Sequence, residues 1–305
     1  MRVLAIDGGG IRGLIPAIVL TELERRAGRR VWEMFDLIAG TSTGGILACA
    51  LSAPDPLPAS EVVKLYEDEG PDIFSRSLFQ RIRSADGLLD EKYDDDALDR
   101  ALERFLGQKL LSQTKPDLIV PSYDTAEPGP YFFKTTDAKA SADDDFPLST
   151  VARATSAAPT YFEPAHFGQP PRALVDGGVF ANNPGICALV DRDTPGALED
   201  VVMVSLGTGQ LTRALPYEQA KDWGLLSWGL HVLDVVFDGM SDTVDHQLKA
   251  LLGDNYLRLQ TELDVAKDDM DDASKDNIGD LETEARQLIG ASEQELAGIC
   301  EKLTA

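Results

Sequence analysis

Two short apolar runs, each ending in a glycine-rich turn that leads into a helix, dominate the first part of the chain. Residues 3–6 are followed by an aspartate and three glycines, and a helical pattern then covers residues 14–26. Residues 35–39 are followed by Gly40-Thr41-Ser42-Thr43-Gly44-Gly45, after which an apolar helix covers 46–51. Repeated strand, turn and helix units build a largely parallel sheet that helices cover on both faces. The sequence therefore predicts an α/β fold.

The remaining sequence continues this pattern without an internal boundary. Helical spacing of apolar residues predicts a helix over 97–106. The chain has no glycine-, proline- or serine-rich linker and no step in composition. We therefore expect residues 1–305 to form a single domain whose C-terminal third, from about residue 216, is mostly helical. Short apolar runs predict four further strands, at 118–120, 131–133, 201–206 and 256–259.

The charge of the chain limits its partners. It has 28 lysine and arginine residues against 52 aspartate and glutamate residues, a net charge of −24. Affinity for nucleic acid and for anionic lipid comes largely from basic residues, so neither is an expected electrostatic partner. Any contact with a membrane surface must be transient, apolar and local. The sequence shows no secretory signal and no apolar run of the roughly 18 residues that a membrane span needs, so the cytoplasm is the expected compartment.

The sequence also gives no pattern for a bound metal or cofactor. Cys49, Cys187 and Cys300 are far apart and lack C-x-x-C spacing, which favours reduced, mostly buried thiols. The acidic runs 143–145 and 268–272 do not have the spacing of a calcium-binding EF-hand loop and lack its glycine. We expect both runs to be solvated loops or helix caps.

The second glycine turn matches the G-x-S-x-G nucleophile elbow. It lies where a strand turns into a helix, which is the context that this motif requires. Small residues around Ser42 allow a tight turn and let a substrate carbonyl approach the backbone. The helix that follows would direct its N-terminal amides towards developing negative charge. The elbow therefore predicts acyl transfer with Ser42 as the nucleophile.

The first glycine turn, Asp7-Gly8-Gly9-Gly10-Ile11-Arg12-Gly13, has two interpretations. Its bare N–H groups suit an oxyanion, and an elbow needs such donors from a neighbouring strand–helix loop. Gly8, Gly10 and Gly13 also fit the G-x-G-x-x-G pattern of a dinucleotide site, with Asp36 at the spacing of a ribose ligand. The elbow favours the oxyanion interpretation, and a nucleotide-binding protein or dehydrogenase is the alternative function.

A serine hydroxyl needs a base, and the residues leave two kinds open. The chain has three histidines, His166, His231 and His246, and none lies in an evident strand-end loop. Asp176 follows a short apolar run and precedes two glycines that would let its side chain reach a cleft. An aspartate with an ordinary pKa near 3.9 is a weak base, so the site would have to desolvate it.

Residues 223–240 form the most apolar helix-like stretch and contain Trp223 and Trp228. A lid or a lipid-facing element would have this composition. We favour a core helix that packs on the sheet, or a contact between subunits, because long apolar helices are usually buried.

Three pieces together, residues 7–13, the elbow and Asp176-Gly177-Gly178, resemble the signature of the patatin-like phospholipase family of plant patatins and their bacterial relatives. Within the first piece, residues 8–13 are called the glycine loop below. The likeness covers almost the whole chain. It includes five further segments, at residues 154–162 (ATSAAPTYF), 182–184 (NNP), 205–209 (SLGTG), 255–258 (NYLR) and 270–274 (MDDAS).

This resemblance implies a patatin-like three-layer α/β sandwich and a calcium-independent lipid acyl hydrolase. It implies a catalytic dyad without histidine, with Ser42 as nucleophile and Asp176 as base, and an acyl-enzyme intermediate. Phospholipids, lysophospholipids or other glycerolipid esters would be the substrates. Some bacterial relatives are activated by a cyclic nucleotide, which makes such a messenger a candidate activator. The implied oxyanion hole consists of the amides of Gly8, Gly9 and Gly10, with Arg12 supporting their loop.

Overall fold

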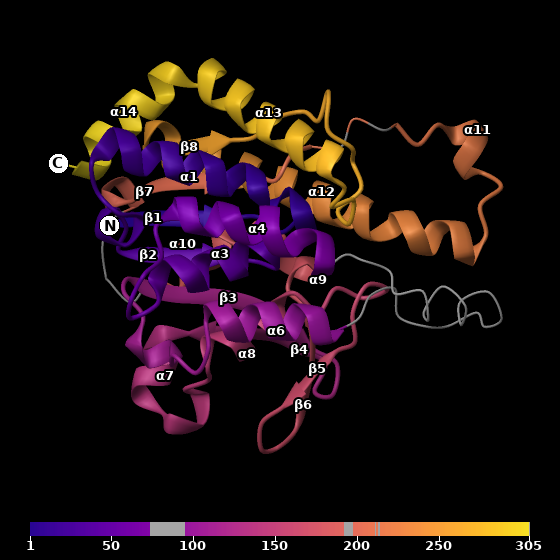
Figure 1. Cartoon of the computed structure of the whole chain (residues 1–305), viewed down its shortest axis with the longest axis horizontal. Coiled ribbons are helices and arrows are strands. Elements are labelled where there is room, and N and C mark those ends of the chain that lie inside the picture. The colour runs from indigo at the N-terminus through magenta and orange to yellow at the C-terminus, as the bar shows by residue number, and fades with distance from the viewer. Residues whose placement is uncertain (74–94, 192–197, 211, 213, 305) are drawn as a thin grey trace.

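The computed structural model describes residues 1–73, 95–191, 198–210, 212 and 214–304. Within this part of the chain, one eight-stranded sheet has the order β5-β6-β3-β2-β1-β7-β8, with β4 paired to β3 (Figure 1). The strands are β1 (Arg2–Ile6), β2 (Leu37–Gly40), β3 (Asp117–Asp124), β4 (Gly129–Lys134), β5 (Ala165–Phe167), β6 (Arg172–Asp176), β7 (Val202–Leu206) and β8 (Tyr256–Leu259).

The part of the sheet that carries the two glycine turns is parallel. β1 pairs with β2 and β7, β2 pairs with β3, and β7 pairs with β8, all in the parallel direction. β4 and β6 run antiparallel to β3, and β5 runs antiparallel to β6. The prediction of a largely parallel sheet is confirmed, and the sheet also has an antiparallel edge that the sequence did not indicate.

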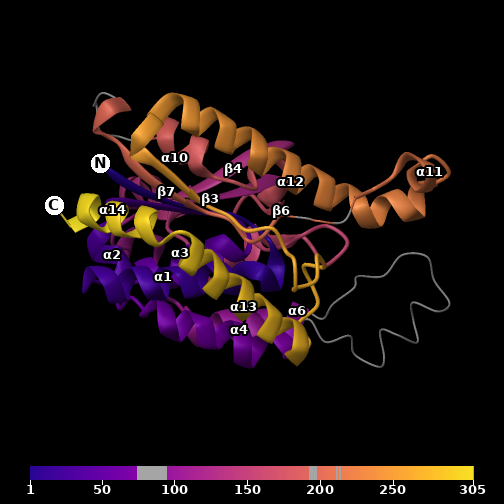
Figure 2. The ribbon, with the colours of Figure 1, turned by 90° about the horizontal axis from the view of Figure 1, so that it is seen from above.

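Helices cover both faces of this sheet. The α-helices are α1 (Leu14–Ala27), α2 (Val31–Met34), α3 (Thr43–Ser52), α4 (Ala59–Ile73), α6 (Asp95–Phe105), α7 (Thr135–Ala140), α8 (Leu148–Thr155), α9 (Gly178–Ala181), α10 (Gly185–Val190), α11 (Tyr217–Ala220), α12 (Leu225–Leu252), α13 (Lys275–Ala291) and α14 (Glu293–Thr304). Short 3-10 helices are η1 (Gly10–Gly13), η2 (Leu111–Gln113), η3 (Ala142–Asp144), η4 (Leu198–Asp200) and η5 (Gly253–Asn255). Figure 2 shows α10 and α12 on one face of the sheet and α1, α3, α4 and α13 on the other, which gives the expected three layers.

Successive side chains along each strand point to opposite faces of the sheet, so neighbouring residues of one strand join different cores. Leu4 and Ile6 of β1 join the larger apolar core, which includes residues of α1, α3, α4 and α13. Val3 of the same strand belongs to the smaller core, with Leu189 of α10 and Leu248 of α12. Because both faces are buried, the parallel strands appear in the sequence as continuous apolar runs.

The predicted elements lie close to their observed positions. β8 has the expected bounds, and α1 begins at the predicted Leu14. β2 begins at Leu37 instead of Phe35, because Phe35 ends α2 and the carboxylate of Asp36 accepts a hydrogen bond from the backbone N–H of Arg2. The three cysteines are free, and Cys49 and Cys300 are buried as expected.

The fold corrects the prediction for residues 223–240. From Phe237 onwards, near the middle of α12, the helix packs on the sheet, and Phe237 is 4% exposed. The first half projects from the body with α11 (Figure 1, Figure 2) and leaves Trp228 and Val235 40% and 46% exposed. With 28 residues, α12 is about 42 Å long, whereas a five-residue strand spans only about 17 Å. The favoured interpretation of a buried core helix is therefore wrong for the first half, which extends past the sheet.

Of the two acidic runs, 268–272 lies in the loop before α13, as the sequence predicted, whereas Asp143 and Asp144 lie in η3, which Ser141 caps. Asp145 accepts hydrogen bonds from the N–H and hydroxyl of Ser112 (2.8 and 2.7 Å), and Asp272 accepts one from the N–H of Ser274 (3.0 Å) just before α13. Across the described residues, no group of three or more His, Cys, Asp or Glu side chains is arranged to hold a metal ion. The described helices include none that is both long and apolar enough to cross a membrane.

Candidate active site

Ser42 occupies the sharp turn between β2 and α3. Its backbone angles, φ 54° and ψ −123°, lie in a region that residues with a side chain rarely adopt, as a nucleophile elbow requires. α3 begins very close to β1, since a Cβ on Gly44 would lie 2.3 Å from the carbonyl oxygen of Ile6. Packing therefore requires the last glycine of the motif, and the turn leaves Ser42 at the carboxyl edge of the sheet.

Side chains from two other elements hold this strained turn. The N–H of Ser42 donates to Oγ1 of Thr155 (3.0 Å) at the end of α8, and the hydroxyl of Thr155 donates to the carbonyl of Pro121 (2.6 Å). The hydroxyl groups of Thr43 and Tyr66 are hydrogen-bonded, which ties the start of α3 to α4. The position of the nucleophile thus depends on segments far away in the sequence.

Asp176 reaches the elbow from the antiparallel edge of the sheet. Ala39 of β2 pairs with Ile119 of β3, and β3 continues to Ser122, which pairs with Asp176 at the end of β6. Ser42 follows Ala39 by the same number of residues as Ser122 follows Ile119. The register of the strands therefore brings residues 42 and 176 to the same level of the sheet.

The carboxyl group of Asp176 is fully buried and only half satisfied. Oδ1 accepts a hydrogen bond from the N–H of Gly178 (2.7 Å), and Oδ2 has no hydrogen-bond partner among the described residues. Burial raises the pKa of Asp176 from its ordinary 3.8 to about 7, and the nearby Ser42 hydroxyl and the Gly178 amide partly oppose this rise. Ser42 is close enough to affect this pKa, yet Oδ2 remains an unused acceptor beside the nucleophile.

The glycine loop offers fewer free amides than the resemblance implied. The N–H of Gly8 donates to the carbonyl of Asn182 (3.1 Å), so this amide is already paired and the expectation of three glycine donors is corrected. Within the described chain, the N–H groups of Gly9 and Gly10 make no hydrogen bond. Gly10 has a φ of +59°, and a Cβ there would lie 2.1 Å from the carbonyl oxygen of Met270. Only glycine fits this position.

Arg12 connects the glycine loop to two other segments. Its side chain is 5% exposed, and Nη1 donates to the carbonyl of Asp268 (3.2 Å) in the loop before α13. Burial lowers the pKa of Arg12, whereas the carboxylates of Asp234 and Asp238 on α12 act in the opposite direction. Arg12 therefore lies among carboxylates of α12 and of the acidic run 268–272.

A buried ion pair fixes the start of the glycine loop. Arg258 of β8 donates from Nη1 and Nη2 to the two carboxylate oxygens of Asp7 (3.0 and 2.6 Å), and Nη1 also donates to Oγ of Ser205 (2.8 Å). Asp7 is 1% exposed. Two N–H···O bonds to one carboxylate fix its orientation as well as its position. The residue that leads into the glycine loop is thus held by the edge strand of the sheet.

Ser42 and Asp176 line the same cavity. It encloses about 730 Å³ when its open mouth is counted. Gly10 of the glycine loop lines it as well. A few polar groups in an apolar cavity suit a substrate that has one reactive polar bond and a long apolar part. The apolar walls come from α3, α4, α6 and α12 and include Ile46, Leu65, Ile73, Leu98, Leu233 and Phe237.

The described histidine side chains lie away from this cavity. His166 on β5 and His246 on α12 are exposed, and neither lines the cavity. The side chain of His231 lies outside the described residues. Among the described side chains, the carboxyl of Asp176 is the candidate base beside Ser42.

The position of Asp36 disagrees with a dinucleotide site at the glycine loop. Its carboxylate accepts hydrogen bonds from the N–H and Nη2 of Arg2 (2.7 and 3.1 Å). Arg2 begins β1, whereas the glycine loop follows the other end of this strand, about 17 Å away. Asp36 is therefore too distant to bind the ribose of a nucleotide held by the loop.

Several residues that support the site were not predicted to have a role. Thr155, Asn182 and Arg258 lie in or beside segments that resemble the family, but those segments do not indicate which groups they bind. Tyr66 lies in an ordinary amphipathic helix without a local signal. The one available sign for Thr155 was a polar residue at the otherwise small and apolar end of α8.

Comparison with known proteins relates the chain to plant and bacterial proteins. It is 34% identical to Patatin-like protein 2 of Arabidopsis thaliana in an alignment of 310 positions that covers 85% of this chain and 75% of that protein. It is also 34% identical to a cGAMP-activated phospholipase of Pseudomonas aeruginosa over 297 residues, which cover 95% and 84% of the two chains. The crystal structure of VipD from Legionella pneumophila is 12% identical with a TM-score of 0.44, covering 95% of this chain and 66% of that one.

A family assignment follows from two of these findings. Residues 4–185, more than half of the chain, match the family described as patatin-like phospholipase. The plant and bacterial relatives exceed 30% identity over most of both lengths. The chain therefore belongs to the patatin-like phospholipase family.

Proposed function

We propose that the chain is a lipid acyl hydrolase of the phospholipase A or lysophospholipase type, in which Ser42 and Asp176 form the catalytic dyad. The observation that carries this proposal is their common cavity, where a nucleophile in a strained elbow lies beside a buried carboxylate oxygen that has no hydrogen-bond partner in the described part of the chain. The family supports hydrolysis of lipid esters. The apolar walls support a fatty-acyl group as the part of the substrate that the cavity binds.

The reaction proceeds in two halves. Oγ of Ser42 attacks the ester carbonyl carbon while Asp176 accepts the hydroxyl proton, and the resulting oxyanion binds the N–H groups of Gly9 and Gly10. Collapse of this intermediate expels the alcohol, which takes the proton from Asp176 and leaves the acyl group on Ser42. Water, deprotonated by Asp176, then attacks the acyl-enzyme, and the fatty acid leaves as Ser42 regains its proton.

The environment of Asp176 explains how a carboxylate can act as this base. An ordinary aspartate holds a proton too weakly to take one from an alcohol efficiently. With a pKa of about 7, Asp176 is ionised in about half of the molecules at neutral pH and binds the transferred proton more strongly. The Gly178 amide occupies Oδ1, which leaves Oδ2 for the hydroxyl of Ser42.

Labelling with a fluorophosphonate probe tests the nucleophile. The parent should be modified at Ser42, as read by peptide mass spectrometry, and Ser42→Ala should carry no adduct. Ser52→Ala is the matched control, because Ser52 is a buried serine of the same helix and is absent from the described cavity wall. An unlabelled parent whose melting temperature rises with NAD or ATP would favour the nucleotide-binding alternative.

The base is tested by Asp176→Asn. This variant keeps an oxygen for the Gly178 amide but cannot accept a proton, so we expect it to fold and to lose at least about a hundredfold in kcat/KM on acyl esters. Circular dichroism checks the fold. Hydrolysis at the parent's rate would place the base elsewhere.

Substrate and activator need separate measurements. Digestion of a lipid extract, followed by mass spectrometry, identifies the lipid class and the bond that is cleaved, and EDTA should leave the rate unchanged if the reaction is calcium-independent. The bacterial relative named a cGAMP-activated phospholipase makes cGAMP the first activator to add. A rate that is unchanged at saturating cGAMP would remove it as a candidate activator of this chain.

A further inference from the structure

Two apolar cavities lie between helices α3, α4 and α6. The first is the cavity that contains Ser42 and Asp176. The second encloses about 250 Å³ including its open part, and every described residue that lines it is apolar. Ile46 of α3 and Leu65 of α4 line both cavities, so these two side chains form the wall between them.

The second cavity continues the first in the direction that leads away from Ser42. Along α3, Ser42 and Ile46 line the first cavity, and Ile46 and Ala50 line the second. Along α6, Leu98 lines the first and Leu102 lines the second. Both helices thus change from one cavity to the other at the same level, and Ala50 lies about 12 Å beyond Ser42 along α3.

On the α4 side the order is reversed, as an antiparallel helix requires. Ile73 and Gly70, at its end, line the first cavity, and Val62, near its start, lines the second. Leu65 is 6% exposed and lies between them. On the α3 side, Ile46 is β-branched, and such side chains keep one preferred χ1 in a helix. The wall between the cavities is therefore stiff at Ile46.

We propose that Ile46 and Leu65 form the floor of the acyl-chain site and limit the length of chain that the enzyme accepts, with the second cavity as an extension behind them. This inference rests on the proposed function, because it takes the first cavity as the acyl site. The ligand class is an unbranched fatty-acyl chain, since the second cavity presents no described hydrogen-bonding side chain and such apolar cavities bind apolar groups.

Ile46→Ala tests the floor. Removing this side chain joins the two cavities, so the ratio of kcat/KM for palmitoyl over octanoyl p-nitrophenyl esters should rise about tenfold, as expected when a chain buries roughly two more methylene groups. Ile46→Val removes one methyl group and should shift the ratio in the same direction by less. The double variant Ile46→Ala/Ala50→Leu refills the second cavity and should lose the gain.

Ile18→Ala is the matched control, because Ile18 on α1 is also a partly buried isoleucine packed against the main core and lines neither cavity in the described chain. Its ester ratio should equal that of the parent. A ratio within about twofold of the parent in Ile46→Ala, or a gain that survives Ala50→Leu, would overturn the inference.

Binding of free fatty acids gives a second readout that needs no turnover. The rise in melting temperature with octanoate and with palmitate should favour palmitate more strongly in Ile46→Ala than in the parent. This measurement separates the two proposals. If the fluorophosphonate probe does not label Ser42 in the parent, the proposed function is wrong. If Ile46→Ala has the same fatty-acid preference as the parent, only the proposal that Ile46 and Leu65 form the floor is wrong.

Discussion

At the scale of single residues, the burial of Asp176 has opposite effects on the stability of the fold and on the proposed reaction. A buried carboxylate with one unpartnered oxygen is unfavourable for the fold, because burial disfavours the charged form. The same burial brings its pKa to about 7, where it can take and return a proton near neutral pH. Its contributions to stability and to activity should therefore respond to pH in opposite directions.

The activity of the parent should rise with pH through the pKa of Asp176. The base is active only when ionised, so kcat/KM should increase about tenfold per pH unit below pH 7 and level off above it. Hydrolysis of a soluble, uncharged ester from pH 5 to 9 measures this profile. A rate that stays constant from pH 7 down to pH 5 would contradict a base whose pKa is raised to about 7.

The stability of the fold should show the opposite trend at this residue. Its pKa is about 7 in the folded chain against 3.8 as the ordinary value, so the protonated form stabilises the fold below about pH 4 and this contribution is lost as pH rises to 7. Asp176→Asn is neutral at every pH and should therefore raise the free energy of unfolding at pH 8, by up to about 4 kcal/mol. Urea denaturation at pH 5 and pH 8 measures it, and a gain that is equal at both pH values would contradict the argument.

The sequence indicated the two residues of the proposed dyad better than their surroundings. The elbow is a local motif, so Ser42 could be recognised from its neighbours. The place of Asp176 depends on β6 running antiparallel to β3, which no residue of the short run 172–176 indicates. The pairing of the Gly8 amide with Asn182 joins segments far apart in the chain, and only the assembled sheet shows it.

At the scale of elements, the glycine loop is held from several sides. Asn182 accepts from its first amide, the carbonyl of Met270 accepts from the N–H of Ile11 (2.9 Å), and Arg258 binds the preceding Asp7. These partners come from the end of α9, the acidic run and β8. The loop therefore has little freedom to move, which is what fixed oxyanion donors require.

Gly10→Ala tests how far activity depends on this fixed loop. The added Cβ would lie 2.1 Å from the carbonyl of Met270, so the loop or the acidic run must shift, and we expect a loss of at least about a hundredfold in kcat. Gly28→Ala is the matched control, because Gly28 has φ +63° but a Cβ added there would meet no neighbouring atom within 4 Å. It should cost about 1 kcal/mol of stability and leave kcat unchanged.

The Asp7–Arg258 pair should be required for the fold as well as for the loop. Arg258→Met leaves a buried carboxylate unpaired and should lower the free energy of unfolding by about 3–5 kcal/mol. Adding Asp7→Asn removes that charge and should recover part of the loss. The same urea series on both variants measures this, and a double variant less stable than Arg258→Met would show that the Asp7 charge is not the cause.

The sequence predicted most elements because their apolar runs are continuous and end at glycines. It was wrong for the first half of α12, because composition does not show where the sheet beneath a helix ends. Trp228 and Val235 are as apolar as buried residues, and only the position of this half beyond the body exposes them. The antiparallel edge was missed for a similar reason, since strand direction follows from connections and not from composition.

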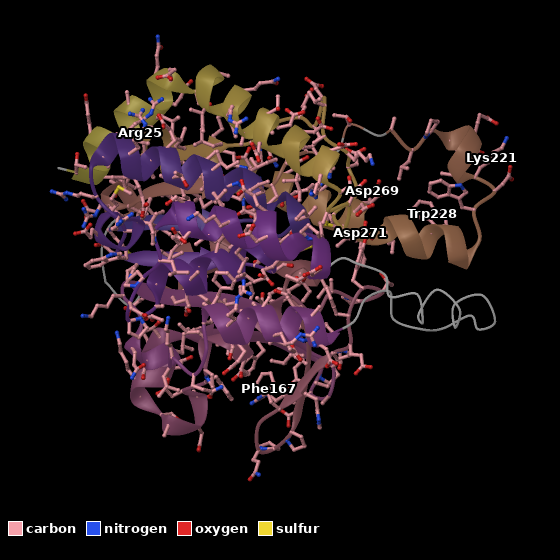
Figure 3. All side chains as sticks on the ribbon, viewed as in Figure 1. Arg25, Phe167, Lys221, Trp228, Asp269 and Asp271 are labelled. Carbon is pink, nitrogen blue, oxygen red and sulfur yellow. The ribbon has the colours of Figure 1, made fainter. Side chains whose placement is uncertain are left out.

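At the scale of the whole molecule, the net charge of −24 is concentrated in part around the cavity. Tyr161 lines the cavity, and burial together with the carboxylates of Asp234, Asp269 and Asp271 raises the pKa of its phenol. Figure 3 shows Asp269 and Asp271 beside α12, close to where its projecting half leaves the body. A lipid head group that approaches the cavity therefore meets negative charge.

Vesicle composition should control the rate through this charge. Phosphatidylcholine vesicles should be hydrolysed several-fold faster than phosphatidylglycerol vesicles at about 0.01 M salt, where charges act over about 30 Å. The difference should shrink at about 0.15 M salt, where the screening length falls to about 8 Å. Because a soluble ester lacks a head group, its rate should not change with salt, which separates attraction to the surface from catalysis.

Two matched variants decide whether the charge near the cavity or the charge of the whole molecule is responsible. Asp269→Asn/Asp271→Asn removes two charges beside the cavity and should raise the rate on phosphatidylglycerol several-fold, since one charge near an anionic surface is worth about 1 kcal/mol. Asp143→Asn/Asp144→Asn removes the same charge at η3, which packs against α7. If only the net charge matters, the two variants should hydrolyse phosphatidylglycerol at equal rates. If the charge acts only within a screening length, the first variant should be faster than the parent and the second should have nearly the parent's rate.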